Sequence, residues 1–154
     1  MSLDKVKNYF KEYKIDNRII ELSTSTATVK EAAESLHTEE ARIAKTLSFI
    51  VEDKPILIVT AGDAKIDNSK YKGLFHQKAK MIPFEEVNTL IGHNVGGVCP
   101  FAINKEVIVY LDESLKRFET VYPACGSSNS AIELTIKELE KYSNFNNWID
   151  VCKY

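Results

Sequence analysis

The sequence of 154 residues contains no long hydrophobic run, and this absence argues against membrane insertion. Residues 1–7 alternate charged with apolar side chains and do not form the apolar core of a secretory signal peptide. No later segment approaches the roughly 20 apolar residues that a membrane-spanning helix requires. We therefore predict no membrane contact and a cytoplasmic location.

Cysteine and histidine are scarce, and neither forms a disulfide or metal-binding pattern. The chain has three of each: Cys99, Cys125, Cys152, His37, His76 and His93. The cysteines are odd in number, widely spaced and without a CxxC pair, which favours neither a disulfide framework nor a zinc site. The histidines match no HExxH motif. We predict reduced thiols, no metal and no cofactor.

The sequence also lacks phosphate-binding motifs and an excess of positive charge. Neither GxGxxG nor a Walker-type glycine loop occurs, so nucleotide hydrolysis has no support. The net charge of −2 argues against broad electrostatic binding to duplex nucleic acid. Residues 65–80 nevertheless carry five lysines against Asp67, a local charge of +4. This segment is either a phosphate-facing patch or a solvated lysine face.

What is present is the composition of an ordinary globular domain. Hydrophobic residues make up 44% of the chain and charged residues 27%. A chain of this length forms one domain, which we expect to span residues 1–154 and to bury roughly two thirds of its unfolded surface.

Apolar periodicity predicts helices interleaved with strands. Expected helices cover residues 2–14, 28–36, 69–75, 83–91 and 136–142, with a short helix after Thr38. Expected strands cover residues 18–22, 45–51, 55–61, 78–82, 107–111, 118–122, 131–135 and 148–152. The runs 55–61 and 107–111 are continuously apolar, which is typical of strands covered on both faces. Without a strict strand–helix–strand rhythm, the pattern favours a mixed sheet and the α/β or α+β class.

Thr28 and Glu31 form a capping box at the start of the expected helix 28–36. Each side chain in such a box can satisfy the other residue's backbone N–H. Asp67 and Asp112 are each expected to cap the short helix that follows them.

Lys45 stands out on the expected strand 45–51. It shares a strand face with Leu47, Phe49 and Val51, so its position directs it toward the core. A lysine in such a place must reach solvent, a partner or a ligand anion. Alternatively, Lys45 ends the preceding helix and extends outward to solvent. The pattern alone leaves both interpretations open.

A first glycine loop, residues 96–101, precedes the apolar run 107–111. Adjacent glycines allow positive φ and a close approach of ligand to main chain, and Pro100 fixes the exit of the turn. Such a loop can direct N–H groups at an oxyanion. Cys99 and His93 also suggest a thiol nucleophile with a histidine base, which would need a stabilised thiolate. The alternative is that Cys99 is a small apolar plug in the turn.

A second glycine loop lies between two expected strands. It consists of Gly126, Ser127, Ser128, Asn129 and Ser130. Its hydroxyl and amide groups could bind ribose or an amino acid. A plain turn would have the same composition, because these residue types favour turns for local backbone reasons.

Five segments of the chain follow an order and spacing that resemble those of the YbaK/EbsC family, the editing domains associated with prolyl-tRNA synthetase. They are residues 44–49, 62–67, 96–101, 112–115 and 126–134. The resemblance extends from about Thr28 to Tyr142. It implies a compact mixed α/β fold with a curved, barrel-like sheet surrounded by helices. It also implies hydrolysis in trans of the ester of a mischarged tRNA that carries a small amino acid.

The same resemblance implies roles for the residues singled out above. Lys45 matches the family's functionally important lysine, and residues 96–100 match its GxxxP substrate loop. Lys45, Gly96 and Gly97 are therefore candidate catalytic residues, and the implied partners are the 3′ acceptor end of a tRNA and an aminoacyl-tRNA synthetase. Candidate substrate-binding residues are Val98, Cys99, Pro100, Gly126, Ser127, Ser128, Asn129 and Ser130. Candidate tRNA contacts are Lys65, Lys70 and Lys72.

Two departures from the family pattern bear on the substrate. Cys99 stands where many members have serine, and Ala131 where some relatives have an acidic or amide residue. We expect Cys99 to line the pocket and to influence which amino acid fits. Two other functions stay open: a noncatalytic module that binds an acylated nucleotide end or another small ligand, and a cysteine hydrolase that uses Cys99 with His93.

Overall fold

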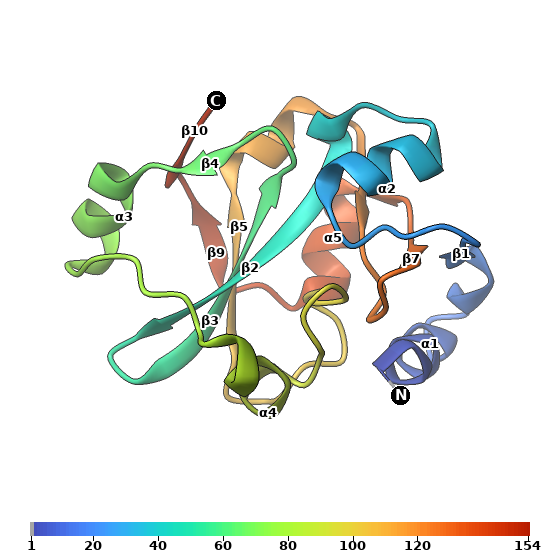
Figure 1. Ribbon diagram of the computed structural model, residues 1–154, viewed down its shortest axis with the longest axis horizontal. Coiled ribbons are helices and arrows are strands. Elements are labelled where there is room, and N and C mark those ends of the chain that lie inside the picture. The colour runs from blue at the N-terminus through green and yellow to red at the C-terminus, as the bar shows by residue number, and fades with distance from the viewer. Residues whose placement is uncertain (1) are drawn as a thin grey trace.

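The apolar run 55–61 forms the central strand of the protein, as its composition predicts. In the computed structural model, which describes residues 2–154, β3 (Lys54–Ala61) lies between β2 (Ile43–Val51) and β5 (Ile108–Asp112) (Figure 1). The side chains from Ile56 to Ala61 are at most 2% exposed. Both faces of β3 are therefore covered, and the core forms around it.

The sheet around β3 is mixed and curls into half a barrel. Its order is β8-β6-β2-β3-β5-β9, where β6 (Thr120–Pro123), β8 (Leu134–Thr135) and β9 (Asn147–Ile149) are the outer strands. β2 pairs antiparallel with β3 and parallel with β6, and β5 pairs parallel with both β3 and β9. β8 is antiparallel to β6. The expected mixed class and barrel-like sheet are confirmed.

Two short ribbons lie outside this sheet. β1 (Ile20–Glu21) pairs antiparallel with β7 (Ser130–Ala131), and β4 (Lys65–Ile66) pairs antiparallel with β10 (Cys152–Lys153). The first ribbon ties the N-terminal segment to the second glycine loop. The second ties the turn after β3 to the C-terminal segment.

Helices surround the sheet. Residues 2–154 form five α-helices: α1 (Ser2–Lys11), α2 (Val29–Leu36), α3 (Asn68–Phe75), α4 (Val87–Ile91) and α5 (Ile136–Ser143). Short 3-10 helices cover Asp16–Arg18, Glu40–Arg42, Phe84–Glu86 and Glu113–Arg117. Figure 1 shows α1, α2 and α5 toward one end of the molecule and α3 at the opposite end. None of the described helices has both the length and the apolarity that a membrane span requires.

Threonine side chains cap the starts of α2 and α5. Thr28 Oγ1 accepts the Glu31 N–H at 3.1 Å, but the Glu31 carboxylate accepts from the Thr28 hydroxyl instead of its N–H. The predicted capping box is therefore only half formed. A complete box starts α5, where the side chains of Thr135 and Glu138 each accept the other residue's N–H.

The prediction of a strand at residues 78–82 is wrong. Met81 makes a single bridge to Phe49 of β2. On either side of it, the Ile50 N–H donates to the Lys80 carbonyl and the Ile82 N–H donates to the Ser48 carbonyl. Pro83 follows at once and has no N–H with which to continue the pairing. The segment therefore lies against the edge of β2 without forming a strand.

Other boundaries shift where a hydrogen bond turns the chain away from its neighbour. The expected strand 131–135 divides into β7 and β8, because the Ile132 N–H donates to the Pro123 carbonyl. The expected strand 148–152 divides into β9 and β10, because the Val151 N–H donates to Asp112 Oδ1. The other shifts of two or more residues are at the starts of residues 18–22, 45–51, 83–91 and 118–122, each preceded or opened by a 3-10 helix, and at the end of α1.

The Arg18–Glu138 pair predicts an acid-dependent contribution to stability. Arg18 donates to both carboxylate oxygens, at 2.7 and 3.1 Å, and lowers the Glu138 pKa from 4.5 to about 2. The stabilisation of the folded state by this ion pair is present above pH 4.5 and is lost as the pH falls toward 2. The reason is that, in this range, the carboxylate binds a proton in the unfolded chain more readily than in the folded one. Glu138→Gln should lower the free energy of unfolding by roughly 0.5 kcal/mol at pH 7. Urea titrations should show that the difference in unfolding free energy between wild type and variant narrows below pH 4.5. A difference that stays constant with pH would show that the ion pair does not stabilise the fold.

Candidate functional site

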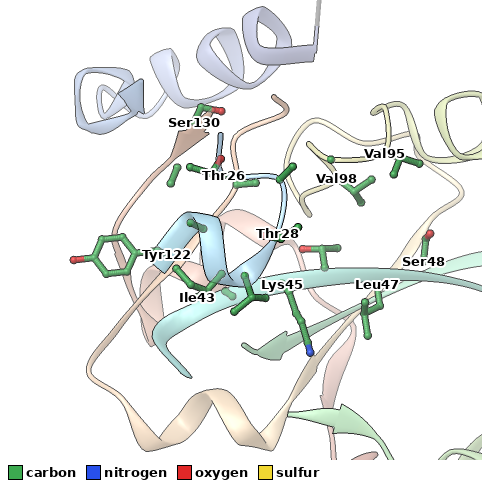
Figure 2. A pocket seen from close by; sticks show the side chains of 18 of the residues that line it. Thr26, Thr28, Ile43, Lys45, Leu47, Ser48, Val95, Val98, Tyr122 and Ser130 are labelled. Atoms are coloured by element: carbon green, nitrogen blue, oxygen red, sulfur yellow. The ribbon is translucent and has the colours of Figure 1, made fainter. Parts of the chain in front are cut away.

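A pocket opens between α2, β2 and the loop that carries Gly96 (Figure 2). Its volume is about 350 Å³, which is within the range of small-molecule sites. The lining is mostly apolar and is drawn from residues 26–36, 43–48, 81–87, 95–98 and 122–131. In the part of the chain that the structure describes, Lys45 and Tyr122 are the only titratable side chains of this lining. The pocket wall thus offers no carboxylate or histidine as a general base.

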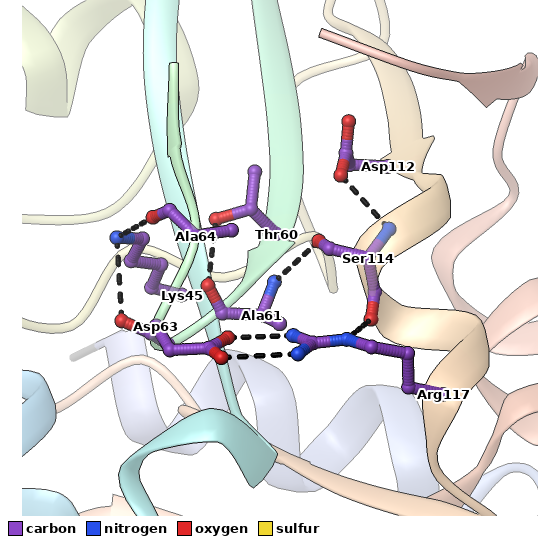
Figure 3. A network of polar contacts seen from close by, with 9 residues as sticks. Lys45, Thr60, Ala61, Asp63, Ala64, Asp112, Ser114 and Arg117 are labelled. Carbon is purple, nitrogen blue, oxygen red and sulfur yellow. Dashed lines mark hydrogen bonds and ion pairs between the residues drawn. The ribbon is translucent and has the colours of Figure 1, made fainter. Parts of the chain in front are cut away.

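Lys45 belongs to β2 and is half-buried at the edge of the pocket, which favours the core-side interpretation over a helix end. Figure 2 shows its side chain leaving β2 on the opposite side from Val95 and Val98. Its ammonium donates to the carbonyl of Ala64 at 2.5 Å and to that of Gly62 at 3.5 Å (Figure 3). Burial lowers the Lys45 pKa. Since an ammonium has three N–H donors, one is left for a ligand oxygen.

The turn after β3, residues 62–67, supplies these two carbonyls and is fixed from both sides. A Cβ at Gly62 would lie 1.9 Å from the carbonyl oxygen of Glu40, so only glycine fits there. The Asp63 carboxylate accepts from Arg117 at 2.6 and 3.0 Å, and this ion pair lowers the Asp63 pKa (Figure 3). Asp67 caps α3, as predicted. The position of the lysine ammonium therefore depends on several segments that the sequence separates widely.

The two adjacent glycines of the first loop serve different purposes. Gly96 has a φ of +96°, whereas Gly97 has no positive φ. A Cβ at Gly97 would lie 2.6 Å from the carbonyl carbon of Gly126 and 2.7 Å from the N of Ser127. The two glycine loops therefore pack backbone against backbone. The Gly97 N–H donates to the Asn94 carbonyl at 3.1 Å and Gly97 is outside the pocket lining, which argues against an oxyanion role for this residue.

Gly96 and Val98 keep their N–H groups available. Both residues line the pocket, and no acceptor within residues 2–154 binds either N–H. Main-chain donors are obligatory hydrogen-bonding groups, so a donor left open beside a pocket favours a ligand acceptor. These two N–H groups are the candidate oxyanion donors of the loop.

Gly97→Ala tests the contact between the two loops. The new methyl would meet the backbone of Gly126 and Ser127, which cannot rotate away, so the free energy of unfolding should fall by about 1–3 kcal/mol. Gly73→Ala in α3 is the matched control, because a Cβ there meets no atom within 4 Å outside its own helix. The control should stabilise by up to about 1 kcal/mol through helix propensity. Thermal unfolding measures the stability of both variants. If Gly97→Ala is as stable as the wild type, the close contact between the two loops is refuted.

The second glycine loop mainly holds another segment in place. The Asn129 carbonyl accepts the Leu22 N–H at 2.8 Å, and the Asn129 side chain donates to the Leu22 carbonyl at 3.0 Å. The Ser128 carbonyl accepts the Thr26 N–H at 2.5 Å. Only Ser130 of this loop lines the pocket. The other predicted substrate-binding residues of the loop lie outside that lining: Gly126, Ser127, Ser128 and Asn129.

Two threonine hydroxyls in the pocket are buried and have no hydrogen-bond partner within residues 2–154. They belong to Thr26, in the segment before α2, and to Thr46 on β2. Leaving a buried hydroxyl unpaired costs roughly 1–3 kcal/mol, so a ligand that binds it recovers that free energy. The sequence analysis missed both residues. Thr26 lies in an ordinary polar stretch, and Thr46 beside Lys45 belongs to no motif of its own.

Cys99 is fully buried and does not line the pocket, contrary to expectation, and Pro100 is likewise buried outside it. The Cys99 Sγ lies 3.5 Å from His93 Nε2, but Nε2 lies 2.7 Å from the Phe101 carbonyl and therefore carries the proton it donates there. Burial raises the pKa of Cys99 to about 12 and lowers that of His93. Because Nε2 cannot also accept the thiol proton, the geometry disfavours a cysteine hydrolase.

The three buried thiols should resist alkylation in the folded protein. Burial raises the pKa of Cys99 and Cys152 to about 12 and that of Cys125 well above its usual range, so little thiolate forms at pH 8. Mass spectrometry after iodoacetamide treatment should find unmodified native protein and triply modified protein in urea. Rapid modification of Cys99 in the native protein would instead support its role as a nucleophile.

The predicted tRNA-contacting lysines lie apart from the pocket, on β4 and α3. Lys70 donates to the Asp150 carboxylate at 3.0 Å and to the Cys152 carbonyl at 2.9 Å, while Lys65 and Lys72 are exposed. Their contact with tRNA stays a prediction. Across residues 2–154, His, Cys, Asp and Glu side chains form no cluster of three that could hold a metal ion.

Comparisons with known proteins agree on one family. The model of the aminoacyl-tRNA editing domain matches residues 23–142. The uncharacterised protein YwhH of Bacillus subtilis is 54% identical over 154 residues, which is 99% of this chain and 98% of YwhH. EbsC of Enterococcus faecalis, a proposed Cys-tRNA(Pro)/Cys-tRNA(Cys) deacylase, is 26% identical over 119 residues, 76% of this chain and 73% of EbsC. A crystal structure of a proposed trans-editing enzyme for prolyl-tRNA synthetase has a TM-score of 0.87 and 29% identity, covering 99% of this chain and 98% of its own.

Proposed function

Because the chain belongs to the aminoacyl-tRNA editing domain family, we propose that it hydrolyses the ester of a mischarged tRNA that carries a small amino acid, with the tRNA for proline as substrate. EbsC is described as acting on Cys-tRNA(Pro), and the structural neighbour as serving prolyl-tRNA synthetase. Both descriptions support the 3′ acceptor end of a tRNA as the partner. A synthetase would be the source of the mischarged tRNA, and the cytoplasm the place of reaction.

The observation that carries the proposal is a pocket with open main-chain donors and no general base. The N–H groups of Gly96 and Val98 would stabilise the negative charge that develops on the ester carbonyl oxygen as water attacks. Each well-aimed donor contributes about 3 to 4 kcal/mol. Water forms a bond to the carbonyl carbon, the ester C–O bond breaks, and the ribose oxygen leaves as a hydroxyl. The neighbouring ribose hydroxyl would carry the proton from water to the leaving oxygen.

Lys45 would position the substrate rather than transfer a proton. Two carbonyls already fix its ammonium, and the remaining N–H can bind a phosphate or ribose oxygen at the edge of the pocket. A lysine held in this way loses less side-chain entropy when the ligand arrives. Its charge favours an anionic oxygen.

The pocket lining would select the amino acid. Its apolar walls leave room for a small side chain, and the free hydroxyls of Thr26 and Thr46 can accept hydrogen bonds from the amino group or donate to the ribose. Ala131 contributes only a methyl group to the wall, so no carboxylate or amide binds the amino acid from that position.

Release of amino acid from a panel of mischarged tRNAs tests the function. The panel should contain tRNA for proline charged with alanine, cysteine or serine, and the wild type should hydrolyse at least one above buffer. Lys45→Ala should lower kcat/KM by about 10- to 100-fold through loss of a charged hydrogen bond. Lys137→Ala, an exposed lysine on α5 outside the pocket lining, is the matched control and should retain full activity.

Two further outcomes separate the alternatives. Saturable binding of aminoacyl-tRNA without turnover would overturn the proposed deacylase activity and support a noncatalytic binding module. Cys99→Ser should retain activity, and loss of activity in a folded Cys99→Ser variant would favour the cysteine hydrolase instead.

A further inference from the structure

Exposed apolar side chains gather at the mouth of the pocket. Met81 is 57% exposed, Phe84 74% and Val95 49%, and all three line the pocket. The other exposed large hydrophobic residues of the described chain lie elsewhere: Tyr13, Leu74 and Tyr154. Apolar surface concentrated around one opening marks a site where a ligand or partner is bound.

The backbone around Phe84 keeps its ring at this mouth. Pro83 ends the contact with β2, and a 3-10 helix covers Phe84–Glu86. Ile82 and Val87, on either side, are buried in the core, so the segment is anchored at both ends. Among the ring pairs of residues 2–154, none involves Phe84. The backbone that carries Phe84 is therefore anchored, and its exposed ring is accessible to a ligand.

The chemistry of the substrate indicates what would cover this face. If the pocket holds the amino acid and its ester, the next groups are the terminal ribose and its base. An adenine is flat and aromatic, and bases stack on aromatic side chains with roughly 1–3 kcal/mol per base. A thioether such as that of Met81 also packs well against an aromatic ring.

The charges that flank Met81 and Phe84 in the sequence favour a nucleic acid strand that approaches from one side. Lys78 and Lys80 are exposed just before Met81, and neither forms an ion pair within residues 2–154. Glu85 and Glu86 are exposed immediately after Phe84 and would repel phosphates from that side. The preceding phosphates should therefore lie along the lysines.

We propose that Phe84, flanked by Met81 and Val95, is the stacking platform for the terminal adenine of the tRNA. This inference rests on the proposed function, because it takes the acceptor end as the ligand. It goes further in assigning the base to the exposed mouth of the pocket and the preceding backbone to Lys78 and Lys80.

Fluorescence of 2-aminopurine tests the platform without requiring turnover. The probe is an RNA acceptor-stem hairpin that ends in two cytidines and 2-aminopurine and carries alanine through a non-hydrolysable amide. Stacking on an aromatic ring quenches this base, so wild type and Phe84→Trp should quench it on binding. Phe84→Leu should bind roughly 5- to 100-fold more weakly and lose most of the quenching. Leu74→Ala, an exposed apolar residue of α3 outside the pocket, is the control and should behave as wild type.

The outcomes distinguish this inference from the proposed function. Deacylation and probe binding that are equal in wild type and Phe84→Leu would overturn the platform while the deacylase stands. Quenching that depends on Phe84, in a protein that hydrolyses no mischarged tRNA, would support the platform and overturn the deacylase. Concentration-dependent dimerisation that Phe84→Leu abolishes, without any effect on the probe, would identify a second copy of the chain as the occupant and overturn the platform.

Discussion

The contact between Gly97 and Gly126 is the constraint on which the candidate site depends. These two residues lie 29 positions apart in the sequence, yet a Cβ on Gly97 would fall within 2.7 Å of the opposite backbone. This contact sets Gly96 and Val98 on one wall of the pocket. The second loop in turn binds the segment before α2 through Leu22 and Thr26, so a hydroxyl reaches the pocket from the N-terminal part of the chain. Two loops without catalytic side chains thus give the pocket its shape.

A second fixed arrangement supports Lys45 from the other side of β2. The turn after β3 can present two carbonyls to the ammonium because Gly62 fits against Glu40 and because Arg117 holds Asp63. Each of these contacts contributes little to stability by itself, as is usual for a partly exposed ion pair. Together they keep a positive charge half-buried beside an apolar pocket, where its attraction for an anionic oxygen is stronger than in water.

The pocket combines main-chain donors, unpaired hydroxyls and a fixed cation, and its lining within residues 2–154 holds no general base. Such a site suits a reaction in which the substrate is already reactive and carries its own proton relay. Selectivity then comes from the walls and from whatever the mouth binds. The exposed ring of Phe84 places an aromatic surface where the nucleotide end of such a substrate would emerge.

Hydrophobic periodicity predicts the mixed fold and the central strand at 55–61, because it reflects local burial. For Lys45 it leaves two interpretations open, and the structure decides between them by placing this residue within β2. The sequence also indicated both glycine loops. Three further facts become visible in the folded chain alone: Gly97 serves packing, Cys99 lies in the core, and Thr26 and Thr46 share the pocket with Gly96. Those roles depend on contacts between segments far apart in the chain, and a linear pattern carries no information on which loop meets which.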